Sequence, residues 1–257
     1  MGERPCAVES MDLTFAKQTV VITGASSGIG QTIALDLGSK GAALCLVGRD
    51  LESMRKVAAR IPVNGSHPLP PVVKCYQADL SSASEMQRVA SQLVNDHARV
   101  DILVHSAGAI SQGRVESSPV EELDRQYQTN LRAPYVLTQA LLPALKAARG
   151  QIVFINSTVG HTARAEVSQY AATKHGLSAL ASSLRDEING DGIRVLNVFL
   201  GRTATPMQAA VFASEGRVYQ PERLIQPEDV SAVVLNALSL PRTAEVTEIR
   251  MRPLLKS

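Results

Sequence analysis

Short runs of consecutive apolar residues alternate along the chain with longer segments in which apolar residues recur every three or four positions. This alternation predicts β-strands separated by helices. Most of the short runs are continuous in Val, Ile and Leu, which is typical of parallel strands covered on both faces. The predicted strands lie at residues 19–23, 43–48, 72–78, 100–106, 150–157, 193–200 and 246–251. We therefore expect an α/β fold: one domain built on a doubly wound parallel sheet of about seven strands, with helices on both faces.

Start signals mark several of the helical segments. Ser82 with Glu85, and Ser118 with Glu121, have the spacing of a capping box, and Pro119 would occupy the first helical position of the second segment. The longest predicted helices run over 118–147 and 168–189.

Three segments depart from the repeating pattern. We expect residues 1–16 to be a loose lead-in to a domain that spans 17–257. The sequence VNGSHPLPP at 63–71 predicts a surface loop rich in Pro and Gly. Residues 205–226 have no clean period, and we expect them to form a mobile lid over a ligand.

Composition and charge narrow the classes of partner. Of the 257 residues, 45% are hydrophobic, and 26 Lys and Arg face 24 Asp and Glu, so a net charge of +2 gives no reason to expect nucleic acid or an anionic membrane. No apolar run approaches the roughly 20 residues that span a bilayer, and the first residues lack the apolar core of a signal peptide. The three cysteines, Cys6, Cys45 and Cys75, lack metal-ligand spacing, so we expect no metal and a reducing, cytoplasmic setting.

The first predicted strand leads directly into TGASSGIG, residues 23–30. Glycines at 24, 28 and 30 permit a tight turn and a close approach to a ligand. The helix that follows offers free N–H groups and the positive end of its dipole to an anion. A glycine-rich turn alone is weak evidence, but this one lies between a buried strand and an amphipathic helix. The segment therefore predicts a dinucleotide phosphate site.

The spacing of these glycines is G-x-x-x-G-x-G, and with it the chain resembles the single-domain branch of the short-chain dehydrogenase/reductase family. The likeness extends from about residue 17 to the last predicted strand. It implies a Rossmann-type fold and a nicotinamide cofactor, contacted in this turn by Gly24, Ser26, Ser27, Gly28, Ile29 and Gly30.

The end of the second strand bears on which cofactor binds. A carboxylate there would hold the ribose 2′-hydroxyl of NAD, whereas an arginine would accept the 2′-phosphate of NADP. Gly48 occupies the position where the resemblance places the acid, and Arg49 follows it. Alternatively, Arg49 is a solvated residue, and Asp50 caps the next helix or takes the ribose itself. We expect NADP(H) to be preferred, with NAD(H) possible.

The resemblance implies cofactor contacts further along the chain. They are Asp79 and Leu80 at the adenine, Ala107 and Gly108 beside the fourth strand, and Gly201, Thr203 and Thr205 at the nicotinamide. Asp79 alternatively only caps a turn. The chain departs from the family pattern at His105 and Ser106, where relatives carry two asparagines, and at Leu200, where they carry a proline.

Tyr170 and Lys174 stand four residues apart in a predicted helix, so both side chains point from one face. A free tyrosine, with a pKa near 10, is almost entirely protonated at neutral pH. A nearby ammonium favours the phenolate, so we expect Lys174, together with an oxidised nicotinamide, to lower the pKa of Tyr170 for acid/base work. On its own the pair could equally be an ordinary helix surface.

Two further residues complete the family's catalytic set by resemblance. Ser157, thirteen residues before Tyr170, would polarise the substrate oxygen, and Thr158 beside it is the weaker claimant. Asn130 would bind a water that continues a proton relay from Lys174.

The whole pattern predicts an NADP(H)-dependent oxidoreductase that acts on a small-molecule carbonyl or alcohol, in the reductase direction. A non-catalytic cofactor-binding sensor or scaffold is the alternative, and an epimerase or dehydratase is a weaker one. By resemblance we expect a homodimer or homotetramer, although the apolar run from Ala133 to Leu145 could equally be core. Charged candidates near the substrate are His161, Arg164, Arg202 and Arg217, and they do not identify it.

Overall fold

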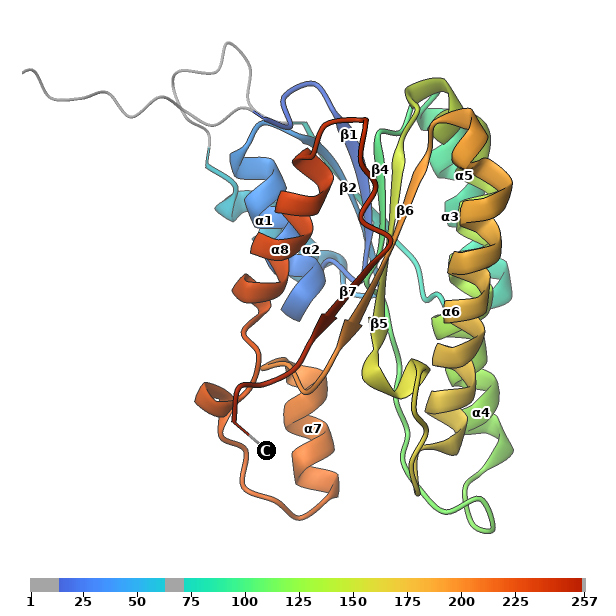
Figure 1. Ribbon diagram of the computed structural model, residues 1–257, viewed down its shortest axis with the longest axis vertical. Coiled ribbons are helices and arrows are strands. Elements are labelled where there is room, and N and C mark those ends of the chain that lie inside the picture. The colour runs from blue at the N-terminus through green and yellow to red at the C-terminus, as the bar shows by residue number, and fades with distance from the viewer. Residues whose placement is uncertain (1–13, 63–71, 256–257) are drawn as a thin grey trace, which may run out of the picture.

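The computed structural model describes residues 14–62 and 72–255. Over these residues the chain forms a seven-stranded sheet with the order β3-β2-β1-β4-β5-β6-β7, and every neighbouring pair is parallel (Figure 1). The strands are β1 (Thr19–Thr23), β2 (Ala43–Gly48), β3 (Val73–Gln77), β4 (Ile102–His105), β5 (Gln151–Ser157), β6 (Arg194–Leu200) and β7 (Glu248–Met251). The predicted Rossmann-type sheet is therefore confirmed, and the predicted strand ends differ from the observed ones by at most two residues.

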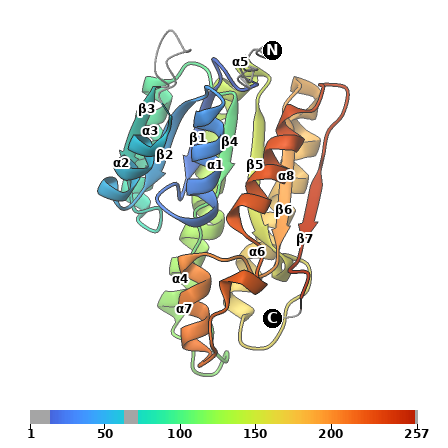
Figure 2. The same ribbon diagram turned by 90° about the vertical axis from the view of Figure 1, so that its left-hand side faces the viewer.

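Helices cover both faces of the sheet, as Figure 1 shows. One face carries α1 (Gly28–Ser39), α2 (Leu51–Arg60) and α8 (Pro227–Ser239). The other carries α3 (Ala83–Asp96), α5 (Ala133–Ala148) and α6 (Ser168–Ile188). Helices α4 (Val120–Tyr127) and α7 (Pro206–Ser214) extend beyond the sheet at one end (Figure 2).

Two apolar cores follow from the alternation of side chains along each strand. Val20 and Ile22 of β1 pack into the core beneath α1, α2 and α8, whereas Val21 between them packs into the core beneath α3, α5 and α6. Because both faces are buried, the strands need apolar residues at nearly every position, which explains their continuous apolar runs.

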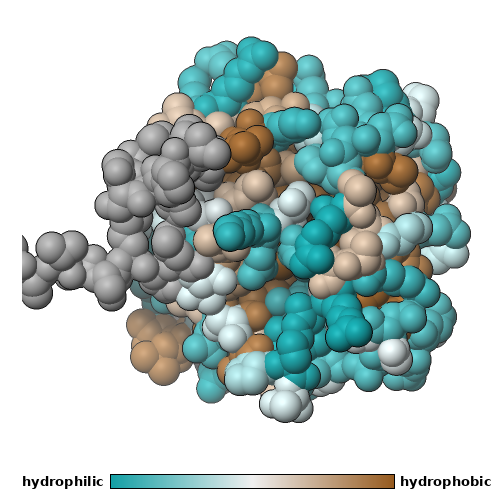
Figure 3. Space-filling view, turned by 90° about the horizontal axis from the view of Figure 1, so that it is seen from above, coloured by the Kyte–Doolittle hydropathy of each residue, from teal (hydrophilic) through white to brown (hydrophobic). Residues whose placement is uncertain are grey.

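The strand order changes direction at β1, which pairs with β2 on one side and β4 on the other. In open α/β sheets, a crevice forms outside the carboxyl ends of the strands at this point. Helices α4 and α7 lie beyond the same end, because they follow β4 and β6 (Figure 2). At the opposite end, the visible surface is mainly hydrophilic, with apolar side chains in small groups (Figure 3).

Only one of the two serines predicted to cap a helix does so. Ser82 does cap α3, because its hydroxyl accepts a hydrogen bond from the Glu85 N–H at 3.4 Å. Ser118 does not cap α4, since its hydroxyl donates instead to the Arg114 carbonyl at 2.8 Å and Pro119 occupies the cap position. That prediction was wrong because a local loop carbonyl competes for the serine hydroxyl.

The predicted helix at 118–147 is interrupted. Between α4 and α5 the chain forms a π-helical turn, Gln128–Arg132, which contains Asn130. Such turns insert an extra residue into a helix and occur often at functional sites.

The three segments that depart from the repeating pattern are described only in part. Residues 205–226, which lack a clear period, contain α7 and a short 3₁₀ helix, Pro221–Arg223. Phe15 lies at the end of the predicted lead-in but is buried in the core, so packed structure begins before residue 17. Residues 1–13 of the lead-in, the loop at 63–71 and Cys6 lie outside the described residues.

Candidate active site

A cavity of about 610 Å³ opens at the carboxyl ends of the strands. Its wall is built from residues that follow each of the strands from β1 to β6. All of the predicted catalytic and cofactor-binding residues line it except Gly30 and Asn130. These two lie directly behind the wall, because each is in contact with a lining residue, Gly24 and Ala109 respectively.

The turn between β1 and α1 has a geometry that only glycine satisfies at two positions. Gly24 has a φ of +68°, and a Cβ there would lie 2.7 Å from the Ala107 Cα. A Cβ at Gly30 would lie 2.4 Å from the Gly24 carbonyl oxygen. Ser27 precedes α1 without capping it through its side chain. The first N–H groups of α1 therefore have no side-chain acceptor from Ser27, and this end of the helix suits a phosphate.

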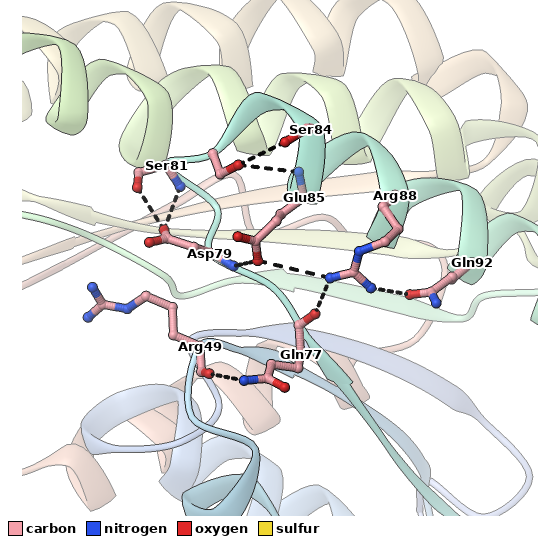
Figure 4. A network of polar contacts seen from close by, with 9 residues as sticks. Arg49, Gln77, Asp79, Ser81, Ser84, Glu85, Arg88 and Gln92 are labelled. Carbon is pink, nitrogen blue, oxygen red and sulfur yellow. Dashed lines mark hydrogen bonds and ion pairs between the residues drawn. The ribbon is translucent and has the colours of Figure 1, made fainter.

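Arg49 follows β2 and lies exposed at the edge of the cavity. Its backbone carbonyl accepts a hydrogen bond from Gln77 Nε2 at 3.0 Å, and Figure 4 shows its guanidinium extending away from this network. Within the described part of the chain, that guanidinium makes no hydrogen bond or ion pair. Asp50 caps α2 by accepting from the Ser53 N–H and hydroxyl at 3.0 and 2.6 Å. Asp50 is therefore engaged, while Arg49 is available to an anion.

Asp79 caps a turn, which is the alternative role that the sequence allowed for it. Its Oδ1 accepts hydrogen bonds from the Ser81 N–H at 2.9 Å and the Ser81 hydroxyl at 2.7 Å (Figure 4). Burial opposes ionisation of Asp79, but these bonds and the Arg49 charge hold its pKa below the usual value. Asp79 also lines the cavity, as does Leu80 after it.

Ser157, Tyr170 and Lys174 meet at the centre of the cavity wall. Ser157 ends β5, and its hydroxyl lies close enough to the Tyr170 phenol to favour the ionised form. Lys174 lies one helical turn after Tyr170 in α6, with Nζ 5.7 Å from the centre of the phenol ring. The Lys174 side chain is buried, and Nζ donates a hydrogen bond to the Ile155 carbonyl at 3.1 Å.

The electrostatics of this group differ from the sequence-based expectation. Burial raises the pKa of Tyr170 to about 12, with only the Ser157 hydrogen bond acting in the opposite sense. Burial also lowers the pKa of Lys174 to about 8. Removal of the phenol from water therefore dominates the pKa of Tyr170, and the neighbouring Lys174 does not bring it below the usual value.

Asn130 has its side-chain amide engaged at both ends. Its Oδ1 accepts from the Ala109 N–H at 2.7 Å, and its Nδ2 donates to the Ala109 carbonyl at 2.8 Å and the Thr173 hydroxyl at 3.0 Å. The side chain thus ties the π-helical turn to the loop after β4 and to α6, next to Lys174.

The segment after β6 keeps its shape without the proline that Leu200 replaces. Thr203 pairs with Ile225 in an isolated parallel bridge, in which Ile225 N–H donates to the Arg202 carbonyl at 3.1 Å and Ala204 N–H donates to the Ile225 carbonyl at 2.8 Å. The Thr205 hydroxyl caps α7 by accepting from the Gln208 N–H at 3.2 Å. Backbone pairing therefore supplies the rigidity that a proline would give.

His105 lies apart from the cavity. It is buried, its Nε2 contacts the Thr138 hydroxyl at 2.9 Å, and its ring stacks on Phe154 with centres 5.0 Å apart. Burial lowers its pKa to about 3, so it is neutral. The neighbouring Ser106 lines the cavity, and its N–H donates to the Thr23 hydroxyl at 3.1 Å.

Three segments form what we call the substrate end of the cavity: residues 109–112, 158–167 and 202–211, the last of which includes the start of α7. Of the charged candidates from the sequence, Arg164 and Arg202 line the cavity, whereas His161 and Arg217 do not. Sequence reasoning missed further lining residues here and on α4, because isolated residues form no motif. They include Ile110, Gln112, Arg125, Thr162, Met207 and Gln208.

Two features of the described residues concern membrane and metal-binding functions. None of their helices is long and apolar enough to cross a membrane. In the same part of the chain, no group of three or more His, Cys, Asp or Glu side chains is arranged to hold a metal ion.

Comparison with known proteins agrees with this geometry. The sequence model of the family described as short chain dehydrogenase matches residues 18–216. An uncharacterised short-chain type dehydrogenase/reductase of Sinorhizobium fredii is 32% identical over 246 residues, which cover 92% of this chain and 91% of that protein.

Solved structures share the fold. A metagenomic short-chain oxidoreductase in complex with NADP has a TM-score of 0.79 and 32% identity, over 95% of this chain and 100% of that one. An alcohol dehydrogenase from the archaeon Thermococcus sibiricus, complexed with 5-hydroxy-NADP, has a TM-score of 0.82 and 26% identity, over 93% and 98% of the two chains.

Adding a single methyl group to the glycine turn tests whether the turn binds the cofactor. Gly30→Ala places a Cβ against the Gly24 carbonyl, which is backbone and cannot move aside, so the turn must deform. We expect the affinity for NADPH, measured by fluorescence titration, to fall by about tenfold or more. Gly38→Ala, in the same helix, meets only the Ile61 side chain and serves as the control. Equal NADPH affinities in the two variants would contradict the assignment of the turn.

The burial of Lys174 can be tested through the pH dependence of stability. Its pKa is about 8 in the folded protein against 10.5 when exposed, so the unfolded chain binds more protons between these values and this lysine makes stability rise with pH there. We expect Lys174→Met to raise the free energy of unfolding below pH 8, by on the order of 3 kcal/mol, and this gain to shrink toward pH 10.5. Urea unfolding at a series of pH values measures it. Lys146→Met, which removes a lysine from the surface, is the control, and no such gain is expected from it. If Lys174→Met gives no gain, or a gain that does not change with pH, Lys174 is not a buried cation.

Proposed function

Because the chain belongs to the short-chain dehydrogenase family, we propose that it is an NADP(H)-dependent oxidoreductase that interconverts a carbonyl compound and an alcohol, of EC 1.1.1 type. The single observation that carries the proposal is that Ser157, Tyr170 and Lys174 line the same cavity as the glycine turn. When bound, the cofactor would supply or accept the hydride.

The cavity fits this cofactor at three points. Gly24 lets the turn pack directly against the Ala107 backbone in the cavity wall, and the N-terminus of α1 suits a pyrophosphate. Arg49 offers a guanidinium that has no partner among the described residues to a 2′-phosphate, while Asp50 is engaged as a helix cap. We therefore propose that NADP(H) is preferred over NAD(H), as the NADP and 5-hydroxy-NADP in the two structural relatives also suggest.

We propose that Tyr170 is the acid/base. A pKa near 12 keeps its phenol protonated at neutral pH, so it can give a proton to the oxygen of a carbonyl as that group is reduced. The Ser157 hydroxyl, which lies beside the phenol, would hold the same oxygen in place. These protonation states favour the reductase direction.

Lys174 would serve both the acid and the cofactor. Among the described residues, its ammonium donates only one of its three N–H groups, to the Ile155 carbonyl, so the others are available to the hydroxyls of a ribose. As Tyr170 loses its proton, the ammonium stabilises the phenolate that forms. Since the side chain of Asn130 is fully engaged, we propose that a water relay at this residue uses its backbone, and that the amide positions Thr173 and Ala109.

We propose three finer points about this enzyme. Residues 205–226 act as the substrate lid. The protein works in the cytoplasm, where Cys45 and Cys75 stay free thiols, as they are here. It assembles as a homodimer or homotetramer; within α5, Leu137 and Leu141 are core residues, which leaves exposed Tyr135 for a partner. A non-catalytic sensor is not favoured, because all four residues of the catalytic set are present.

The role of Tyr170 can be tested by removing one oxygen. We expect Tyr170→Phe to lower kcat for NADPH-dependent carbonyl reduction by about 10²–10⁴-fold, because the proton donor is lost. The affinity for NADPH should change little. Tyr135→Phe, on the exposed face of α5, is the control. A Tyr170→Phe variant with wild-type kcat would refute the mechanism.

The choice of cofactor can be tested at Arg49. We expect Arg49→Ala to weaken NADPH binding by about tenfold or more and to leave NADH binding nearly unchanged, since only NADPH carries the 2′-phosphate. Arg55→Ala removes an equivalent exposed charge from α2, away from the cavity, and controls for net charge. If Arg49→Ala weakens both cofactors equally, the guanidinium does not read the 2′-phosphate.

A further inference from the structure

Charge is distributed unevenly along the cavity. Its substrate end contains two guanidinium groups, Arg164 and Arg202, and no carboxylate among the described lining residues. Asp79, the one acid that lines the described cavity, lies beside Arg49 instead. A site with this charge attracts an anion.

Arg202 is held in a fixed position. It follows Gly201 directly after β6, and its Nη2 donates to both carboxylate oxygens of Glu215 at 2.8 Å. Its guanidinium also lies over the Phe212 ring, 4.6 Å from the ring centre. The side chain is only 15% exposed. An arginine fixed in this way offers its remaining N–H groups in a defined orientation.

One of those remaining groups has no partner. Arg202 Nη1 is buried and makes no hydrogen bond to any other described residue. A buried donor without an acceptor is costly, and more so when it carries charge. The ion pair with Glu215 explains Nη2 but not Nη1. Arg202 belongs to the cavity wall, so a small turn of its side chain would bring this donor to an acceptor on a ligand in the cavity.

Arg164 is a second cation that could contact an anion in the cavity, and it lies in another loop. It lies between Ser157 and Tyr170 in the sequence, lines the cavity and is exposed. It makes no ion pair or hydrogen bond with the rest of the described chain. Glu215, the acid paired with Arg202, does not line the cavity, and it also contacts Arg217, so two guanidinium groups share its single negative charge.

We propose that the substrate is a carbonyl compound that also carries a carboxylate, bound by the guanidinium of Arg202 and assisted by Arg164. This inference rests on the proposed function, which places the reacting carbonyl at Ser157 and Tyr170. The carboxylate then orients the substrate from the side of the lid, while its carbonyl faces the acid/base.

The chain offers a matched control for Arg202. Arg217 also contacts Glu215, at 3.2 Å, and lies 5.0 Å from the centre of the Phe212 ring, but it does not line the cavity. Arg202→Met and Arg217→Met therefore remove similar lid contacts, and only the first removes a cavity cation. Arg202→Lys keeps the charge and guards against a simple folding defect.

The kinetic experiment compares pyruvate, acetoacetate and levulinate with their methyl esters as substrates for NADPH oxidation. For the wild type and Arg217→Met, we expect kcat/KM for at least one acid to exceed that for its ester by about tenfold or more. In Arg202→Met this preference should disappear, mainly through a higher KM for the acid, and Arg202→Lys should restore part of it. Equal values for acid and ester in the wild type overturn the proposal.

A second measurement does not depend on turnover. Isothermal titration of pentanoate and methyl pentanoate into the protein saturated with NADPH should show tighter binding of the acid, lost in Arg202→Met and kept in Arg217→Met. Equal binding of acid and ester, or binding of neither, overturns the carboxylate site. If the acid binds in this way but no carbonyl compound is reduced, the proposed reaction fails while the carboxylate site stands.

Discussion

The active-site region depends on how the fold keeps the ammonium of Lys174 inside the protein. A buried cation is costly unless it is paired, and in the described chain Lys174 has no carboxylate beside it, only the Ile155 carbonyl and the nearby face of Tyr170. The strands of the sheet and the helix α6 hold it there regardless. A charge kept at this cost, with two N–H groups unused, is an arrangement that makes sense when a ligand completes it.

Much of this arrangement could be predicted from the sequence, because its parts are local. The seven strands are continuous apolar runs, and a run needs no distant partner to be recognised. The glycine turn at 24–30 and the spacing from Ser157 to Tyr170 and Lys174 lie within short segments whose geometry follows from one strand and one helix. Parallel strands end at one edge of the sheet, so segments far apart in the sequence meet in one cavity.

What the sequence could not predict comes from contacts between distant segments. The π-helical turn at Gln128–Arg132 is tied to Thr173, 43 residues away from Asn130. The raised pKa of Tyr170 reflects burial by the whole fold, which the four-residue spacing to Lys174 does not reveal. The Arg202–Glu215 pair, with Phe212 beneath it, forms only because the segment after β6 folds back, and no period in residues 205–226 reveals that.

The most direct test measures whether the protein transfers a hydride from NADPH to a carbonyl carbon. The protein is incubated with carbonyl substrates and NADPH that carries deuterium on the transferring face of nicotinamide C4, and the product is analysed by mass spectrometry. We expect one deuterium on the carbinol carbon of the alcohol, with the hydroxyl proton supplied by solvent through Tyr170. Tight binding of NADPH with no deuterium delivered to carbon from either face would contradict the account and leave the protein a cofactor-binding module.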